Sequence, residues 1–445
     1  MRGKFFLTAR IKQIKRSLEI KLKKESEMNG KIIRGNIINP IDRLKTDYHE
    51  NSALVVNNGI IKDLMEYNAA KKKYKEYEIL DYSGKFISPG FIDNHLHIPQ
   101  TNQRARFGEN LMDWLKKYIF LAEDSFADEE TAEKIITNCF NCLIANGTTT
   151  AVMYNSFHKS ATERAFQIAE KSGLKAFIGK TMMDYFVSGK QYEDCEKSLT
   201  ESWDLYKKWH NKDKGRLKYI FSPRFAPACS LDLLNELGKL AKKESIYIQS
   251  HLSENKEEIE QCLNKFFGFE TYTDIYHKTG ILTERTIMGH CIHLSDREFN
   301  LIKETGTKIA HCPSSNFFLK SGSFNLSAAE RKGIELGLGS DVGAGPSFSM
   351  FDVMKSLNYA QPYHIFPQKS YYYATLGNAR VLGIDKYTGN FIKGKDADII
   401  VIDINKYHPD FRFSIVEDLL AYLIYLGHQG FISDVFVRGN KIKLL

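Results

Sequence analysis

The 445-residue chain is poor in cysteine, and its seven cysteines are too few and too scattered for a disulfide framework. We therefore expect free thiols and a reducing, cytoplasmic location. Long hydrophobic runs are also missing, since no apolar stretch approaches the roughly 18 residues that a membrane-spanning helix needs. Hydrophobic residues make up 43% and charged residues 26% of the chain, as in ordinary globular proteins. The sequence thus predicts a soluble, enzyme-sized protein without an integral membrane segment.

Several patterns that carry known chemistry are absent as well. The chain has no Walker motif and no glycine-rich dinucleotide motif. It also lacks the H-x-E and P-C-x-x-C signature of cytidine-type zinc deaminases. One C-x-x-C pair, Cys139 and Cys142, falls inside a helical pattern and has no second pair, so we interpret it as helix packing.

The positive charge of the chain is concentrated at one end. The formal net charge is +8, and residues 1–24 hold nine basic side chains against Glu19 alone. The rest of the chain is formally neutral, which argues against a nucleic-acid partner. Apolar residues at helical spacing make segment 1–28 either a basic amphipathic extension or, if translation starts at Met28, no part of the native fold.

Short β-rich stretches with turn signals occupy both ends of the remaining chain. Asn58-Gly59 suits a tight hairpin, and the stretch 396–403 repeats the same strand-rich style near the C-terminus. We therefore predict one small β-sandwich domain that is discontinuous in sequence and built from residues 29–88 and 386–445.

Between these ends, residues 89–385 alternate short apolar β-branched runs with amphipathic helical segments. This alternation predicts βα units and a parallel sheet, and eight units indicate an α/β fold of the (β/α)₈ TIM-like barrel type. The expected strands are 91–97, 148–154, 175–182, 217–224, 246–252, 286–292, 308–314 and 335–341. Active-site residues of such a barrel lie at the carboxyl ends of the strands.

Metal-binding residue types occur at these expected strand ends. His95 and His97 lie two residues apart on the first strand, so their side chains face the same side. His251 ends the fifth strand, His290 the sixth and Asp341 the eighth. Nitrogen and oxygen donors without thiolate favour a catalytic zinc with an open position for water, and iron or manganese would also accept this set.

A further carboxylate, that of Glu254, is expected near this donor set, and a simpler explanation of the histidines has to be weighed against a metal site. Glu254 follows His251 by three residues, where a helix begins, and could act there as a general acid and base. A single buried histidine is more often a hydrogen-bonded core residue than a ligand. Five donors at matching strand ends favour the metal site over that explanation.

Four segments carry the motifs of a known family: Pro89-Gly-Phe-Ile-Asp-Asn-His-Leu-His97, Ser250-His-Leu-Ser-Glu254, His311-Cys-Pro-Ser-Ser-Asn316 and Gly339-Ser-Asp-Val-Gly-Ala-Gly345. With them the chain resembles the amidohydrolase superfamily from about residue 29 to its C-terminus. The finer motifs His97-Ile-Pro-Gln100 and Ser222-Pro-Arg-Phe225 resemble the guanine deaminase branch. Two segments, Cys291-Ile-His293 and Gly343-Ala-Gly345, depart from the family pattern.

The resemblance implies a metal site and a set of roles. One zinc per subunit would be held by four ligands, the residues His95, His97, His251 and Asp341. Asp341 would also take a proton from the attacking water, His290 would stabilise the developing oxyanion, and Glu254 would protonate a ring nitrogen. Gln100, Arg224 and Phe225 would position a small-molecule purine, because a carboxamide and an arginine fork match ring nitrogens and a carbonyl, and an aromatic face packs on a planar base.

The expected reaction is hydrolytic deamination of guanine to xanthine and ammonia, in purine catabolism or salvage, by a homodimer. A related deaminase acting on another aminated ring, such as 8-oxoguanine or a pterin, is the first alternative. A binuclear site with Lys180 as a carbamylated bridge is a second. A non-catalytic scaffold is a third, and the filled ligand positions argue against it.

Overall fold

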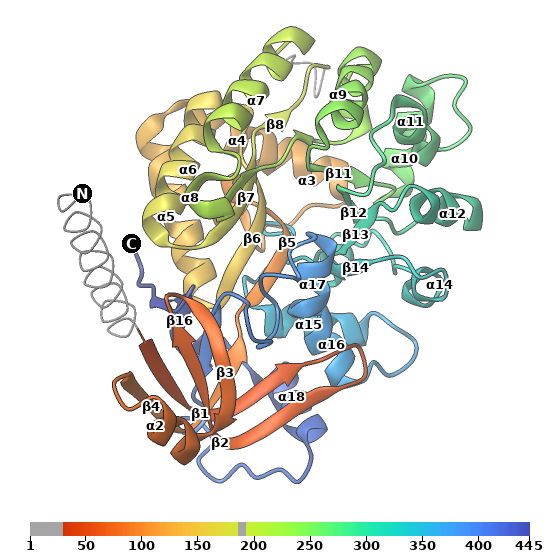
Figure 1. Cartoon of the computed structure of the whole chain (residues 1–445). Coiled ribbons are helices and arrows are strands. Elements are labelled where there is room, and N and C mark those ends of the chain that lie inside the picture. Colours follow the sequence, from red (N-terminus) through yellow and green to blue (C-terminus); the bar gives the residue numbers. More distant parts are fainter. Residues whose placement is uncertain (1–29, 186–192) are drawn as a thin grey trace, which may run out of the picture.

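The computed structural model describes residues 30–185 and 193–445 and shows a barrel with a β domain at one side of it (Figure 1). The predictions for segment 1–28 lie outside the described residues. The barrel and the added β domain confirm the predicted architecture, while the residue limits of the two domains stay a prediction. Among the described residues, no helix is long and apolar enough to cross a membrane.

Eight parallel strands form the wall of the barrel. They are β5 (Phe91–His97), β6 (Thr148–Tyr154), β7 (Lys175–Gly179), β9 (Leu217–Tyr219), β11 (Ile248–Leu252), β12 (Thr286–His290), β13 (Lys308–His311) and β14 (Leu336–Leu338). They pair in the orders β5-β6-β7-β9 and β11-β12-β13-β14. A parallel bridge between Phe221 and Ile248 joins the two halves on one side. On the other side, Asp341 N donates to His95 O at 2.8 Å, so the barrel closes between β14 and β5.

Several predicted strands end earlier than expected, and two of them end at or shortly before a site residue. The expected strand 286–292 ends at His290, and 335–341 ends at Leu338. His290 has φ 65° and Asp341 has φ 49°, in the left-handed region that non-glycine residues seldom adopt. The backbone turns there, which brings these two polar side chains to the mouth of the barrel. Two short strands, β8 (Thr181–Met182) and β10 (Ser222–Pro223), follow β7 and β9 along the chain and pair with each other in parallel.

Amphipathic helices cover the outside of the barrel. The helices that follow the strands are α5 (Glu129–Ala145), α6 (Lys159–Ser172), α7 (Cys195–Trp209), α9 (Leu231–Glu244), α10 (Lys256–Lys265), α11 (Tyr272–Thr279), α12 (Asp296–Glu304), α14 (Leu326–Arg331), α15 (Met350–Tyr359), α16 (Pro367–Ala374) and α17 (Leu376–Val381). Asp128 caps α5 by accepting from Thr131 N, and this helix buries Cys139 against the strands. Both thiols of the C-x-x-C pair are free, in agreement with packing.

Shorter elements fill the connections. They are α2 (Tyr67–Lys73), η1 (Ile98–Gln103), α3 (Leu111–Trp114), η2 (Leu115–Ile119), α4 (Phe120–Asp124), η3 (Ser125–Ala127), α8 (Lys212–Gly215), η4 (Ala226–Ala228), α13 (Pro313–Phe318), α18 (Val416–Leu426) and η5 (Gln429–Phe431). The run from η1 to η3 lies between β5 and α5, at the carboxyl ends of the barrel strands.

The β domain combines strands from both ends of the chain. Its strands are β1 (Gly30–Pro40), β2 (Thr46–Asn57), β3 (Ile60–Glu66), β4 (Glu78–Pro89), β15 (Ile399–Ile402), β16 (Ile432–Val437) and β17 (Asn440–Lys441). They form one continuous sheet in the order β17-β16-β15-β4-β1-β2-β3, in place of two separate sheets. Asn58 (φ 51°) and Gly59 (φ 79°) form the predicted hairpin turn, because both residues adopt the positive φ that this turn requires.

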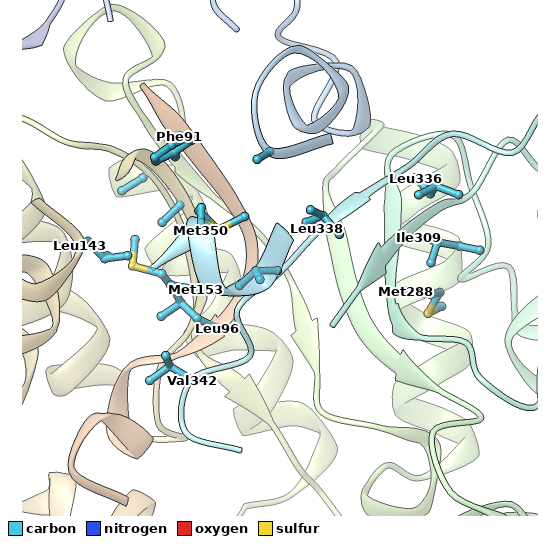
Figure 2. Packing of buried hydrophobic residues seen from close by; sticks show 14 of the residues in the cluster. Phe91, Leu96, Leu143, Met153, Met288, Ile309, Leu336, Leu338, Val342 and Met350 are labelled. Atoms are coloured by element: carbon cyan, nitrogen blue, oxygen red, sulfur yellow. The ribbon is translucent and has the colours of Figure 1, made fainter. Parts of the chain in front are cut away.

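The hydrophobic core lies between the barrel strands and their helices. Figure 2 shows Leu143 of α5 near Met153 of β6, with Phe91 of β5 in the same cluster. Next to this core, Lys175 at the start of β7 donates from Nζ to Asp396 Oδ2 at 2.7 Å and also pairs with the buried Asp398. This cluster of charges joins the barrel to the segment that leads into β15.

Candidate active site

One cavity at the carboxyl ends of the strands collects the predicted site residues. Its lining comprises His97, Gln100, Leu111, Trp114, Leu115, Arg224, Phe225, His251, Glu254, Glu258, His290, Leu319, Asp341 and Ala344. His95, the remaining predicted residue, is buried beside it, with Nε2 3.5 Å from Asp341 Oδ1. The structure therefore brings every site residue predicted from the sequence to one place.

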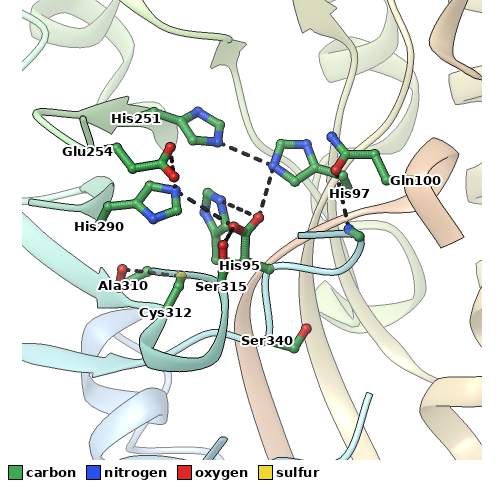
Figure 3. A network of polar contacts seen from close by, with 12 residues as sticks. His95, His97, Gln100, His251, Glu254, His290, Ala310, Cys312, Ser315 and Ser340 are labelled. Carbon is green, nitrogen blue, oxygen red and sulfur yellow. Dashed lines mark hydrogen bonds and ion pairs between the residues drawn. The ribbon is translucent and has the colours of Figure 1, made fainter. Parts of the chain in front are cut away.

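The metal-binding atoms converge in two overlapping groups. His95, His97 and Asp341 form one group, and His95, His251 and His290 form the other, with the donor atoms of each group within 4.8 Å of one another. Figure 3 shows the rings of the four histidines arranged around a common centre. Both groups contain His95, so all five donors surround the same region.

The residues fit a metal ion by their chemistry. His95 Nε2 is buried and accepts or donates no hydrogen bond among the described residues. His97 Nε2 and His251 Nε2 lie 3.2 Å apart, an approach of two ring nitrogens that a shared cation would satisfy. Three imidazoles and one carboxylate are a donor set typical of catalytic zinc.

The protonation states of the donor side chains also suit metal binding. Burial lowers the pKa of His97 to about 3 and lowers the pKa values of His95 and His251, so these imidazoles are neutral at pH 7. Burial by itself opposes the ionisation of Asp341, but the imidazoles of His95 and His97 hold its pKa well below its ordinary value. Neutral imidazoles and an ionised carboxylate are the forms that bind a metal.

Neighbouring groups orient two of these donors. His251 Nδ1 lies 2.6 Å from Arg224 O, so this nitrogen carries the proton and Nε2 keeps its lone pair. Ser315 Oγ donates to Asp341 Oδ2 at 2.6 Å, which leaves Oδ1 beside the histidines. In the sequence, Ser315 stands within the motif His311–Asn316, where no pattern assigns it a role.

Glu254 lies deep in the cavity, between β11 and α10. Its backbone N–H donates to Glu258 Oε2 at 2.9 Å, and Ser321 Oγ donates to its Oε1 at 3.2 Å. Burial raises the pKa of Glu254 to about 7, although the nearby His290 acts in the opposite direction. A carboxyl group with such a pKa can both give and take a proton near neutrality.

His290 faces Glu254 across a short gap. Its Nε2 is 3.5 Å from Glu254 Oε2 and 3.8 Å from Asp341 Oδ2, and its Nδ1 is 2.9 Å from Asn316 Oδ1. Burial would lower the pKa of His290, but the two carboxyl groups raise it above its ordinary value. His290 is thus able to present an N–H to the centre of the cavity.

The opposite wall can recognise a flat polar ring. Gln100 Oε1 accepts from Gly343 N at 3.2 Å, so the amide nitrogen of this side chain remains as a donor. Arg224 follows β10, and its Nη1 is paired with both carboxylate oxygens of Glu123. Phe225 is buried, and Trp114 lies on the same cavity lining.

Lys180, the rival lysine, does not belong to the cavity lining. Its Nζ is buried in an ion pair with Glu193 and lies 3.6 Å from Glu201. The expectation of a second metal bridged by this lysine therefore has no support in the geometry.

Three residues of the site escaped the sequence analysis: Glu123, Glu258 and Ser315. The Asn255-to-Glu258 spacing is that of a capping box, which would have marked Glu258. Ser315 lies within the motif His311-Cys-Pro-Ser-Ser-Asn316, but no pattern there marks a contact with Asp341. Nothing local marks Glu123, since it meets Arg224 across 101 residues of sequence.

Comparisons with known proteins place this site in context. Residues 86–442 match the model of the amidohydrolase family. A guanine deaminase of Dictyostelium discoideum is 35% identical to the chain, over 93% of this chain and 98% of the relative. The solved structure of the Escherichia coli guanine deaminase superposes with a TM-score of 0.88 at 30% identity and covers 93% of this chain and 99% of that one. A guanine deaminase of C. acetobutylicum, solved with guanine bound in its active site, has a TM-score of 0.87 at 33% identity, over 93% and 100% of the chains.

Proposed function

The chain belongs to the amidohydrolase family, and from that premise we propose that it is a guanine deaminase. It hydrolyses guanine to xanthine and ammonia. The observation that carries this proposal is the two-sided cavity, with metal donors and a proton-transfer pair on one side and Gln100, Arg224 and Phe225 on the other. Curated guanine deaminases that are similar over most of the chain support the same conclusion.

The purine is held by the polar and aromatic wall. The free amide N–H of Gln100 and the free N–H groups of Arg224 donate to the carbonyl oxygen and ring nitrogens of guanine. Phe225 packs against the face of the base, and Trp114 and Leu115 close the apolar side. This arrangement directs the amino-bearing carbon of guanine toward Glu254 and His290.

Proton transfer then falls to three side chains. Asp341 takes one proton from the attacking water, and Glu254 gives a proton to the neighbouring ring nitrogen, which makes C2 electrophilic. His290 donates its N–H to the oxygen that joins C2. The proton held by Asp341 then passes to the amino nitrogen, and the exocyclic C–N bond breaks with that nitrogen leaving as ammonia. The hydroxyl proton of the former water returns to Glu254 as the C2 carbonyl forms, so one water is consumed for each guanine converted.

We further propose one zinc ion per subunit, held by His95, His97, His251 and Asp341. When bound, it supplies the acidity that makes water nucleophilic at neutral pH. The neutral imidazoles, the ionised Asp341 and the unsatisfied His95 Nε2 support this choice. Iron or manganese would accept the same donors.

Ammonia release and the ultraviolet spectrum test the function directly. Metal-loaded protein is mixed with guanine, adenine, 8-oxoguanine or a pterin, beside a sample treated with a chelator. We expect metal-dependent conversion of guanine with release of one equivalent of ammonia. Conversion of another ring in preference to guanine would assign the chain to a different deaminase activity, and no conversion of any ring with metal bound would favour the scaffold alternative.

We also propose a homodimer, which the family resemblance implies, and a cytoplasmic location, which the few scattered cysteines favour. Light scattering on the purified chain measures the first, and fractionation of the source cells measures the second.

A further inference from the structure

The guanidinium group of Arg224 is fixed by a buried carboxylate on a different element. Arg224 is 3% and Glu123 is 1% exposed, and a single guanidinium nitrogen, Nη1, meets both oxygens of Glu123. The guanidinium carbon also lies 5.3 Å from the centre of the Phe120 ring. Phe120 and Glu123 both belong to α4, so one short helix holds the arginine from two sides.

This pairing leaves a defined set of donors for a ligand. With Nη1 occupied, the Nε and Nη2 N–H groups of Arg224 have no hydrogen-bond partner among the residues that the structure describes, while Arg224 itself lines the cavity. Arginine offers its donors in a rigid planar fork, so fixing one nitrogen fixes the direction of the others.

We infer that Glu123 is a positioning residue that sets purine affinity and selectivity through Arg224. Its carboxylate compensates the buried positive charge and prevents the guanidinium from turning toward Glu254 or Glu258, which line the same cavity. This inference rests on the proposed function, since it assumes that Arg224 contacts the purine.

Glu123 also connects Arg224 to the run from η1 to η3, which carries apolar residues of the cavity. Leu111, Trp114 and Leu115 of this run line the cavity, and the Glu123–Arg224 pair ties the end of the run to the loop after β10. The ion pair therefore positions the apolar wall and the polar donor of this one cavity together.

The test measures steady-state kinetics of Glu123→Gln, Glu123→Asp and Arg224→Lys, with guanine and with 2-aminopurine, which lacks the carbonyl oxygen. We expect Glu123→Gln to raise KM for guanine at least tenfold, with kcat within threefold of the unmodified chain, and to reduce the preference for guanine over 2-aminopurine. Glu123→Asp keeps the charge, so its KM for guanine should lie between the values of the unmodified chain and of Glu123→Gln. In the Arg224→Lys background, Glu123→Gln should change KM less than twofold, because its target is gone.

A matched control is Glu133→Gln, which removes the exposed partner of Arg164 and should leave both kinetic constants unchanged. If the unmodified chain deaminates guanine, unchanged KM and selectivity in Glu123→Gln would overturn the inference. An equal loss of kcat in both backgrounds would make Glu123 merely structural and would also overturn it. If Glu123→Gln does not fold, Glu123→Asp and its double variant with Arg224→Lys decide the question. If the unmodified chain releases no ammonia from guanine, the result would contradict the proposed function and, with it, this inference.

Discussion

Ser315 Oγ donates a 2.6 Å hydrogen bond to Asp341 Oδ2, while Oδ1 of the same carboxylate lies 3.4 Å from His97 Nε2. The two residues come from α13 and from the turn after β14. The serine thus decides which oxygen of Asp341 faces the histidines, and Figure 3 shows it beneath the cluster of rings.

Replacing Ser315 with Ala should weaken metal binding about 10- to 100-fold, because Asp341 loses the partner that orients it. Competition with a coloured chelator measures the affinity. Ser314→Ala is the control, since Ser314 Oγ has no hydrogen-bond partner in the described part of the chain. Equal affinity in the two variants would contradict the role given to Ser315.

Removing the metal should abolish guanine turnover and lower the midpoint temperature of thermal unfolding. Four buried donors converge in the folded state only, so binding stabilises that state by about 4 kcal/mol when the free metal is 1,000 times its Kd. Calorimetry of chelated and zinc-restored protein measures the shift, and elemental analysis gives the stoichiometry. A midpoint that does not respond to zinc would argue against the site.

Glu254→Gln should reduce kcat roughly 10²- to 10⁴-fold, the usual contribution of a positioned proton donor. Metal content should stay at the level of the unmodified chain, because Glu254 is not among the grouped donors. Glu257→Gln, an exposed change at the start of α10, the helix that follows Glu254, is the control and should retain full turnover. Normal kcat in Glu254→Gln would remove this residue from the mechanism.

Lys175→Met should lower the free energy of unfolding by about 3–5 kcal/mol, because it leaves Asp398 buried without its cation. Urea unfolding measures the loss. Lys159→Met breaks a solvent-exposed pair with Asp204 and should cost far less stability than Lys175→Met. Similar losses for the two variants would show that the buried cluster contributes no special stability to the junction of the barrel and the β domain.

Acid should destabilise the protein partly through His210. Burial, and then Lys218, lower the pKa of His210 from 6.5 to about 4. The unfolded chain therefore binds a proton that the folded chain does not, so this stability is present above pH 6.5 and is lost as the pH falls toward 4. His210→Gln should flatten this part of the pH dependence in urea unfolding between pH 7 and about 4.5, whereas the exposed change His364→Gln should not. Parallel curves for all three proteins would refute the assignment.

Sequence periodicity was enough to predict the barrel. Alternating β-branched runs and amphipathic helices are local patterns, and the first two strands, β5 and β6, match their predicted limits. His95 and His97 share a face because side chains two apart on a strand point the same way. Parallel strands bring their carboxyl ends to one mouth, so the convergence of His251 and Asp341 also followed from the sequence.

Contacts between distant segments could be decided only by the tertiary structure. Glu123 meets Arg224, and Ser315 orients Asp341. The strands from the two ends of the chain form one continuous sheet, in place of the predicted sandwich, through the pairing of β15 with β4. Local patterns determine which face of an element is buried, whereas the partner that a buried charge meets depends on how whole elements pack. The metal donors were therefore predictable from strand ends, and the groups that hold them in place were not.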